Sequence, residues 1–196
     1  VEVGVTHLEN AERPVVSFGQ GCEGEPLLQA DLLESSIREM RRHTDRGTIN
    51  CNTNASLPDD VARLREAGLD SIRVSLNSAR EEFYHNYYRP RNYTFSDVRN
   101  SITAMKKCGG FVSLNYFILP GFSDSEQETE AFVQLIEETR PDYIQLRNLN
   151  IDPEWYLSEI GSSAVSPAHG IRKWLDIIRK KFPLLRFGYF NPCLNP

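Results

Sequence analysis

Residues 15–28 read VVSFGQGCEGEPLL, which combines a short β-favouring run, a glycine-rich loop and the start of a helix. The run at 15–18 has the β-branched and aromatic residues typical of a strand, and Gly19 ends it. Pro26 suits the first turn of the helix that follows, because a helix start leaves its first N–H groups unpaired anyway. This stretch therefore predicts one strand–loop–helix unit.

The same unit recurs along the rest of the chain. Four more strand-like runs are predicted at residues 48–51, 71–76, 112–119 and 143–146. Apolar residues at helical spacing separate and follow these runs, at residues 28–43, 58–67, 95–105, 125–136 and 171–178. Strands that alternate with helices indicate right-handed crossovers and a parallel sheet covered by helices.

Two architectures have this element order, a doubly wound sheet and a barrel. An eight-unit barrel typically takes about 250 residues, whereas this chain has 196 residues and five or six units. We therefore expect an α/β fold, a partial and open TIM-type barrel of parallel strands with outer helices. We expect one domain over residues 1–196, with residues 184–196 as a C-terminal extension.

Composition excludes several classes of partner. The net charge is -5, with 27 acidic against 22 basic residues, which argues against a surface that neutralises nucleic-acid phosphates. No apolar run approaches the roughly 20 residues that span a bilayer, and the first residues lack the pattern of a secretion signal, so we expect a cytoplasmic protein without a membrane partner. The four cysteines are scattered and show no metal-site or disulfide spacing.

The loops that follow the five strands are rich in Gly, Asn, Ser and Asp. They cover residues 19–25, 52–56, 77–80, 120–124 and 147–152, and in a parallel α/β sheet all of them lie at the edge where ligands bind. Turns in general favour these residue types, so turn chemistry alone is the alternative explanation. The pattern indicates a site for a small polar ligand at this edge.

The first of these loops is the most specific. Glycines let the backbone approach a ligand closely, and the Glu25 carboxylate is able to accept hydrogen bonds from an ammonium group. The segment 17–28 resembles the glycine-glycine-glutamate motif after the second strand of radical S-adenosylmethionine (radical SAM) enzymes. The resemblance implies that Gly21, Gly24 and Glu25 hold the amino group of the methionine moiety.

Later segments resemble the same family in the same order. Residues 52–55 are similar to the turn after its third strand, 75–79 to the serine-rich end of the fourth, 117–121 with Asp124 and Glu128 to the end of the fifth, and 144–148 to the sixth, which borders adenine. The resemblance covers residues 14–156. It implies further cofactor-binding residues, which are Asn52, Asn54, Ser75, Asn77, Arg89, Gly121, Gln145 and Arg147.

The sequence also departs from the family pattern. Glu23 and Ala55 stand where the family has glycines, and no triplet of cysteines with three-residue and two-residue gaps exists to hold a four-iron cluster. We expect that the chain begins after the cluster loop and lacks the first strand–helix unit. The strand at 15–18 then has an exposed edge, which favours self-association or an added strand from residues 1–5.

The resemblance implies an intact enzyme that cleaves S-adenosylmethionine reductively with a [4Fe-4S] cluster, to make a deoxyadenosyl radical that acts on a substrate, which the sequence leaves open. It implies no catalytic or metal-binding residue within these 196 residues. Two alternatives remain. A lyase or aldolase barrel needs a lysine or paired carboxylates at the strand ends, and a binding or scaffold domain uses the same edge for a partner.

Overall fold

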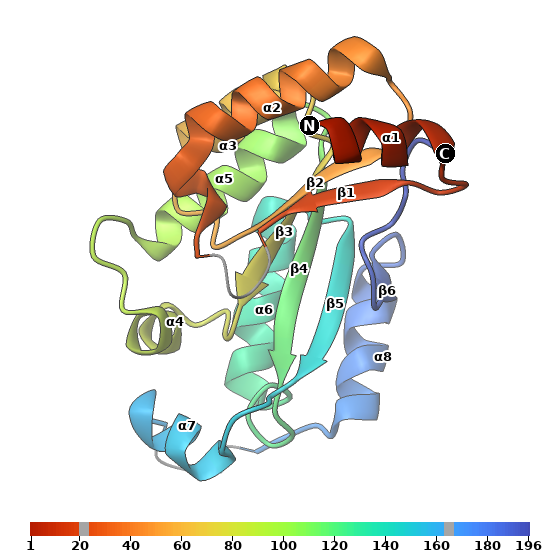
Figure 1. Ribbon diagram of the computed structural model, residues 1–196. Coiled ribbons are helices and arrows are strands. Elements are labelled where there is room, and N and C mark those ends of the chain that lie inside the picture. The colour runs from red at the N-terminus through yellow and green to blue at the C-terminus, as the bar shows by residue number, and fades with distance from the viewer. Residues whose placement is uncertain (20–23, 163–166) are drawn as a thin grey trace.

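The computed structural model describes residues 1–19, 24–162 and 167–196. Its six strands form one parallel sheet in the order β1-β2-β3-β4-β5-β6, so that every strand pairs with its neighbour in the sequence (Figure 1). The strands are β1 Val15–Phe18, β2 Thr48–Thr53, β3 Ser71–Leu76, β4 Phe111–Ile118, β5 Tyr143–Asn148 and β6 Arg186–Gly188. A doubly wound sheet reverses its strand order part-way, so this order identifies the expected open barrel.

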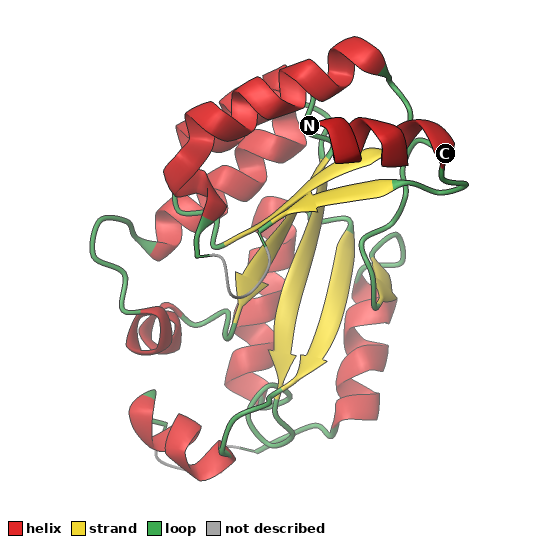
Figure 2. Ribbon diagram, in the orientation of Figure 1, coloured by secondary structure: helices red, strands yellow, loops and turns green. Residues whose placement is uncertain are grey.

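Helices connect the strands and cover one face of the sheet, as Figures 1 and 2 show for α6 behind β3 and β4 and for α8 beside β5 and β6. Their bounds are α1 Glu2–Asn10, α2 Ala30–His43, α3 Pro58–Ala67, α4 Glu81–Tyr88, α5 Phe95–Lys107, α6 Glu126–Thr139, α7 Pro153–Glu159 and α8 Ile171–Lys181, with a 3-10 turn η1 at Pro26–Gln29. None of the helices in the described ranges is long and apolar enough to cross a membrane.

The core lies between the sheet and these helices. Alternate strand residues such as Ile49, Val74 and Leu114 are fully buried there and belong to the same apolar cluster as Phe132 of α6 and Trp174 of α8. Because successive side chains of a strand point to opposite faces, the residues between them face the other way. We call that second face the inner face.

The inner face is polar. Ser17 Oγ accepts a hydrogen bond from Asn50 Nδ2 at 3.3 Å, and Asn50 also donates to Asn52 Oδ1 at 2.9 Å. Ser113 and Gln145 are both buried on the same side of β4 and β5. A polar interior is the arrangement expected when the inside of a barrel binds a ligand rather than serving as a second apolar core.

Four elements were not predicted from the sequence. They are α1, α4, α7 and β6. The expectation that residues 1–5 add a strand is wrong, because they enter α1, whose Leu8 is fully buried in the main core. Self-association through β1 stays a prediction. The segment 184–196 is more than an extension, because β6 pairs with β5 from Tyr143↔Arg186 to Gln145↔Gly188.

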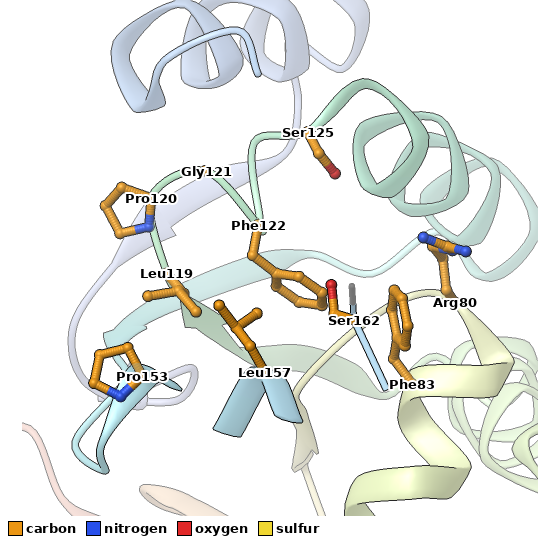
Figure 3. A pocket seen from close by; sticks show the side chains of 10 residues that line it. All are labelled: Arg80, Phe83, Leu119, Pro120, Gly121, Phe122, Ser125, Pro153, Leu157 and Ser162. Atoms are coloured by element: carbon orange, nitrogen blue, oxygen red, sulfur yellow. The ribbon is translucent and has the colours of Figure 1, made fainter. Parts of the chain in front are cut away.

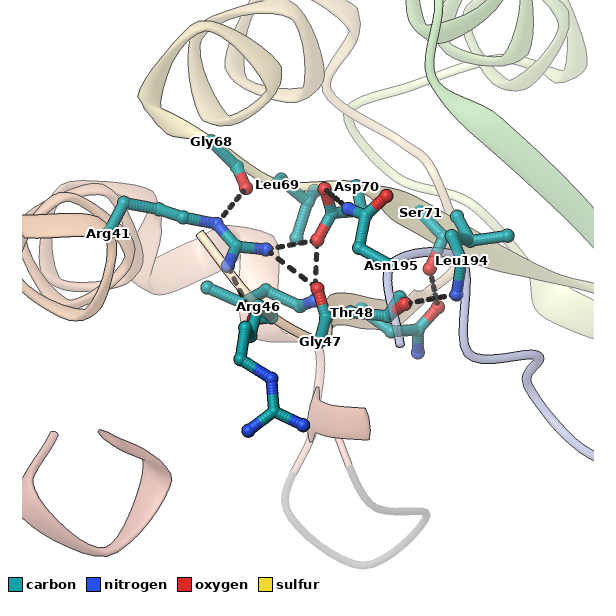
Figure 4. A network of polar contacts seen from close by, with 12 residues as sticks. Arg41, Arg46, Gly47, Thr48, Gly68, Leu69, Asp70, Ser71, Leu194 and Asn195 are labelled. Carbon is teal, nitrogen blue, oxygen red and sulfur yellow. Dashed lines mark hydrogen bonds and ion pairs between the residues drawn. The ribbon is translucent and has the colours of Figure 1, made fainter. Parts of the chain in front are cut away.

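The last residues of the chain cross to the start of β2 and β3 (Figure 4). Leu194 N donates to Thr48 Oγ1 at 2.7 Å, and Gly47 N donates to the Asn195 carbonyl at 2.6 Å. Asp70 anchors the same network, since it pairs with Arg41 and accepts from Ile49 N at 2.7 Å. The C-terminal segment therefore spans the open side of the barrel at the amino ends of its strands.

Candidate functional site

The loop after β1 is held in place by the carboxylate of Glu25. Its Oε1 accepts from Leu27 N at 3.0 Å and from Thr53 Oγ1 at 2.5 Å, and its Oε2 accepts from Asn54 N at 2.7 Å. Glu25 thus caps the η1 turn and joins the first loop to the second. The Glu25 carboxylate, which was expected to accept hydrogen bonds from an ammonium group, already accepts three from the protein. Its first role is therefore to position the loop.

Gly24 lies beside Glu25 with a backbone φ of 83°, a conformation that favours glycine. Apart from its two chain neighbours, a Cβ atom at this position meets no atom of the described residues within 4 Å, so those residues leave the space next to this backbone open. Gly19 differs, because a Cβ there lies 2.3 Å from the Asn52 carbonyl oxygen. Gly21, the third glycine of interest, lies outside the described residues.

The loop after β2 adopts a glycine-like turn with an alanine. Ala55 has a φ of 57° although it is fully buried, and its carbonyl accepts from Ser101 Oγ of α5 at 2.7 Å. Asn54 Oδ1 accepts from Ser56 N at 3.0 Å, which tightens the same turn. Ala55 stands where the family has a glycine, and its backbone keeps the left-handed conformation that glycine adopts most easily.

The loop after β3 depends on a buried carboxylate from α6. Glu128 accepts from Ser78 Oγ at 2.7 Å, from Ala79 N at 2.6 Å and from Tyr116 Oη at 2.6 Å. Burial raises the pKa of Glu128, and these three donors act in the opposite direction. Asn77 lies at the start of the loop, where its Nδ2 donates to Phe83 O at 3.0 Å, while its buried Oδ1 has no partner in the part of the chain that the structure describes.

The loop after β4 borders a separate cavity of about 370 Å³ (Figure 3). Gly121, with a φ of 89°, lines it together with Arg80 and the side chains of Phe83, Phe122 and Leu157 from α4, the loop and α7. Gly121 N donates to Asp124 Oδ1 at 2.6 Å. Of the predicted site residues, Gly121 is the one in this cavity, which is mainly apolar.

Four predicted residues lie on the inner face, and a residue of the C-terminal tail joins two of them. Asn52 donates to the Gly19 carbonyl at 2.8 Å, and Gln145 donates to Asn191 Oδ1 at 2.8 Å. Asn191 Nδ2 in turn lies 3.3 Å from Asn52 Oδ1, so this tail residue connects β2 with β5 across the interior. Arg147 lies two residues after Gln145 on the same face of β5, and Ser75 of β3 also faces this side.

Arg89 is placed differently. It ends α4 with a φ of 48°, its side chain is 71% exposed, and its Nη2 pairs with Glu159 Oε2 of α7 at 2.6 Å. The other predicted residues that the structure describes lie at strand ends or inside the barrel, so Arg89 is not grouped with them.

Sequence reasoning missed three inner-face residues, Arg73, Asn115 and Asn191. Alternate residues of a strand face the same side, so the sequence could have predicted that Arg73, two positions before Ser75, lies on the same face as Ser75. Asn191 carried no local signal, because its contact with Ser17 spans 174 positions of the chain.

Comparison with known proteins agrees with this geometry. The family model of the radical SAM superfamily matches residues 5–133. The chain belongs to the radical SAM superfamily. Among curated proteins, it is 32% identical over 127 residues to GTP 3',8-cyclase of Campylobacter lari, which covers 63% of this chain and 36% of that protein. It is 28% identical over 164 residues to GTP 3',8-cyclase of Marinobacter nauticus, with 83% and 46% covered. This radical SAM chain thus spans less than half the length of these two relatives.

Two solved structures share the fold. Methylornithine synthase superimposes with a TM-score of 0.66 at 13% identity, over 95% of this chain and 53% of that one. A domain of pyruvate-formate lyase-activating enzyme from Bacteroides vulgatus gives 0.61 at 13% identity, over 88% and 98%. At such identities the likeness shows the partial barrel alone.

The two cofactors of the family fit this chain differently. The open space at Gly24 and the unpaired, buried Asn77 Oδ1 at the same end of the sheet are compatible with S-adenosylmethionine. The cluster does not fit, because the sequence lacks the cysteine triplet and, within the described part of the chain, no three His, Cys, Asp or Glu side chains gather as metal ligands. Cys51 is fully buried in the core, on the face away from the inner one.

Proposed function

We propose that this chain provides the S-adenosylmethionine cradle of a radical enzyme, with the [4Fe-4S] cluster held by cysteines that these 196 residues do not contain. The observation that carries the proposal is the linked edge of loops after β1, β2 and β3. Glu25 joins the first loop to the second, and Glu128 holds the third. In the intact enzyme, reductive cleavage of S-adenosylmethionine would supply the radical that acts on a separate substrate, and this chain would hold the cofactor for that step.

Within this cradle, each residue has a defined task. The backbone at Gly24 approaches the methionine amino group, with Glu25 as its support, and Asn54, Ser75 and Asn77 contribute polar contacts at the next two strand ends. The backbone of Gln145–Arg147 borders the adenine. When bound, S-adenosylmethionine supplies the source of the radical, while this chain binds and orients it.

The lyase or aldolase alternative lacks its key residue. All five lysines of the sequence lie in α5 and α8, and none follows a strand. Lys106 pairs with Asp142 at 2.6 Å, just before β5, which is the opposite end of the sheet from the loops described above. A Schiff-base mechanism therefore has no lysine at the ligand-binding edge. The scaffold alternative is decided by the binding experiment below.

Titration of the chain with S-adenosylmethionine, followed by calorimetry and NMR, tests the proposal. We expect a Kd in the millimolar range, roughly -4 kcal/mol, because the contacts that the cluster makes to the methionine group are missing. Chemical-shift changes are expected at residues 24–25, 52–54, 75–77 and 145–147. Binding at helix surfaces, or no binding at all, contradicts the cradle and favours the scaffold.

A pair of glycine variants controls this experiment. Gly24→Val places a branched side chain in the open space and is expected to abolish the shifts. Gly109→Val carries the same kind of strain, since Gly109 has a φ of 71° and also faces open space, but it lies before β4 at the far end of the sheet. Gly109→Val is therefore expected to retain binding. If both variants bind equally, the ligand does not lie beside Gly24.

A further inference from the structure

The strands contain positive charges but no negative ones. In the six strand segments, Arg73, Arg147 and Arg186 are the charged residues, and no Asp or Glu occurs. Arg186 lies over the Phe111 ring at 5.5 Å. Arg73 of β3 and Arg147 of β5 are left on the inner face, in a protein whose net charge is -5. The positive charge is therefore local and is not a property of the whole surface.

The described residues do not satisfy all the hydrogen-bond donors of the Arg73 guanidinium group. Its Nε is buried and has no hydrogen-bond partner among the residues that the structure describes, and its Nη1 makes one long contact of 3.5 Å to Gln145 Oε1. Burial lowers the pKa of Arg73, and the nearby charge of Arg147 lowers it further. A buried guanidinium donor without an acceptor costs free energy, so this side chain is suited to a ligand that supplies one.

Arg147 shares the same space. Its Nη2 donates to the Tyr189 carbonyl at 3.3 Å, and its guanidinium lies 4.7 Å from the centre of the Tyr189 ring. Among the described residues, no carboxylate forms an ion pair with either Arg73 or Arg147. Within the described ranges, the two cations therefore have each other nearby and no carboxylate paired with them.

Asn115 adds an acceptor between them. In the strand register, Arg73 aligns with Ser113, Asn115 aligns with Gln145, and Arg147 aligns with Phe117, so Asn115 lies at the level between the two arginines. Its Oδ1 is buried, with no partner in residues 1–19, 24–162 and 167–196. The inner face thus offers unpaired guanidinium donors and one unpaired acceptor within a short stretch of three strands.

We propose that Arg73 and Arg147 bind an anionic group of the substrate, a phosphate or a carboxylate, and that Asn115 accepts a hydrogen bond from a neighbouring hydroxyl or amine of the same molecule. The assignment rests on the proposed function, because it places this substrate beside the cofactor edge. Planar guanidinium groups match both anions through paired hydrogen bonds. The side chain of Arg147 serves the anion, while its backbone borders the cofactor.

Calorimetric titrations of the 196-residue chain with pyrophosphate and with citrate test the inference. The wild-type chain is expected to bind at least one of the two, and the tighter one distinguishes phosphate from carboxylate recognition. Arg73→Gln and Arg147→Gln should each weaken that binding at least tenfold. Arg73→Lys keeps the charge without the planar fork and should lie between wild type and Arg73→Gln.

Arg172→Gln is the matched control, since Arg172 is an exposed arginine at the start of α8. It should leave anion binding unchanged. No binding of either anion by wild type, or equal affinities in Arg73→Gln and Arg172→Gln, overturns the inference. Failure of the proposed function looks different, because S-adenosylmethionine binding is then lost while anion binding and its dependence on Arg73 remain.

Discussion

Replacement of Glu25 by alanine tests whether this carboxylate mainly holds the loops of the site together. It removes three acceptor contacts, to Leu27 N, Thr53 Oγ1 and Asn54 N. Hydrogen bonds to charged groups contribute about 1.5–3 kcal/mol each, but water is able to reach this half-buried position and replace part of that. We expect Glu25→Ala to lower the free energy of unfolding by about 2–4 kcal/mol.

Urea unfolding followed by circular dichroism measures this change, and a chain of this size should lose about 2–4 °C in Tm per kcal/mol. Glu25→Gln keeps one carbonyl oxygen and should lose about half as much. Glu130→Ala, at an exposed position of α6, is the matched control and should stay within about 0.5 kcal/mol of wild type.

A double-mutant cycle with Thr53→Val separates the loop contact from a general loss of stability. Thr53 Oγ1 donates directly to Glu25, so the two substitutions should be non-additive by at least about 0.5 kcal/mol. Additive effects, or a loss below about 0.5 kcal/mol in Glu25→Ala alone, refute the reasoning. Glu25 is then free to contact the ligand as the sequence resemblance implied.

Two further predictions concern backbone strain and pH. Arg140 ends α6 in an exposed position with a φ of 50°, so Arg140→Gly should be about 1 kcal/mol more stable than Arg140→Ala, which keeps the strained β-carbon; equal Tm values for the two variants contradict this. Burial raises the pKa of Cys51 from 9.0 to about 12, with a smaller effect of Glu25 in the same direction. The folded protein therefore keeps a proton that the unfolded chain loses, and the resulting stability is complete below pH 9 and disappears as the pH rises to about 12. Denaturant unfolding should show a steeper loss between pH 9 and 12 for wild type than for Cys51→Val, and parallel pH profiles would argue against a buried, protonated thiol.

The strand–helix framework follows from local sequence. Residues 15–18 and 71–76 were predicted as strands with the bounds that the structure has, and α3 begins at Pro58 and ends before Gly68 as expected. These elements depend on patterns within a few residues, such as β-branched runs, helical spacing and capping residues. The motifs at 17–28, 52–55 and 75–79 also indicated the superfamily before any contact was known.

Tertiary contacts decided the rest. The N-terminal helix α1 contains valines and a glycine that do not favour a helix, and its Leu8 is buried in the main core. The strand β6 is three residues long and pairs only with β5, so its own sequence carries little signal. Local propensity is a weak guide when one long-range contact determines an element.

The same reasoning applies to the site. The order of Gly24, Glu25 and Asn54 in the sequence was enough to place them at one edge of the sheet, because parallel strands end on the same side. It did not show that Glu25 is occupied by protein donors, or that Asn191 reaches Ser17 and Gln145 from the tail. Those contacts join positions that are 28 to 174 residues apart, so they exist only once the barrel has brought the strands together.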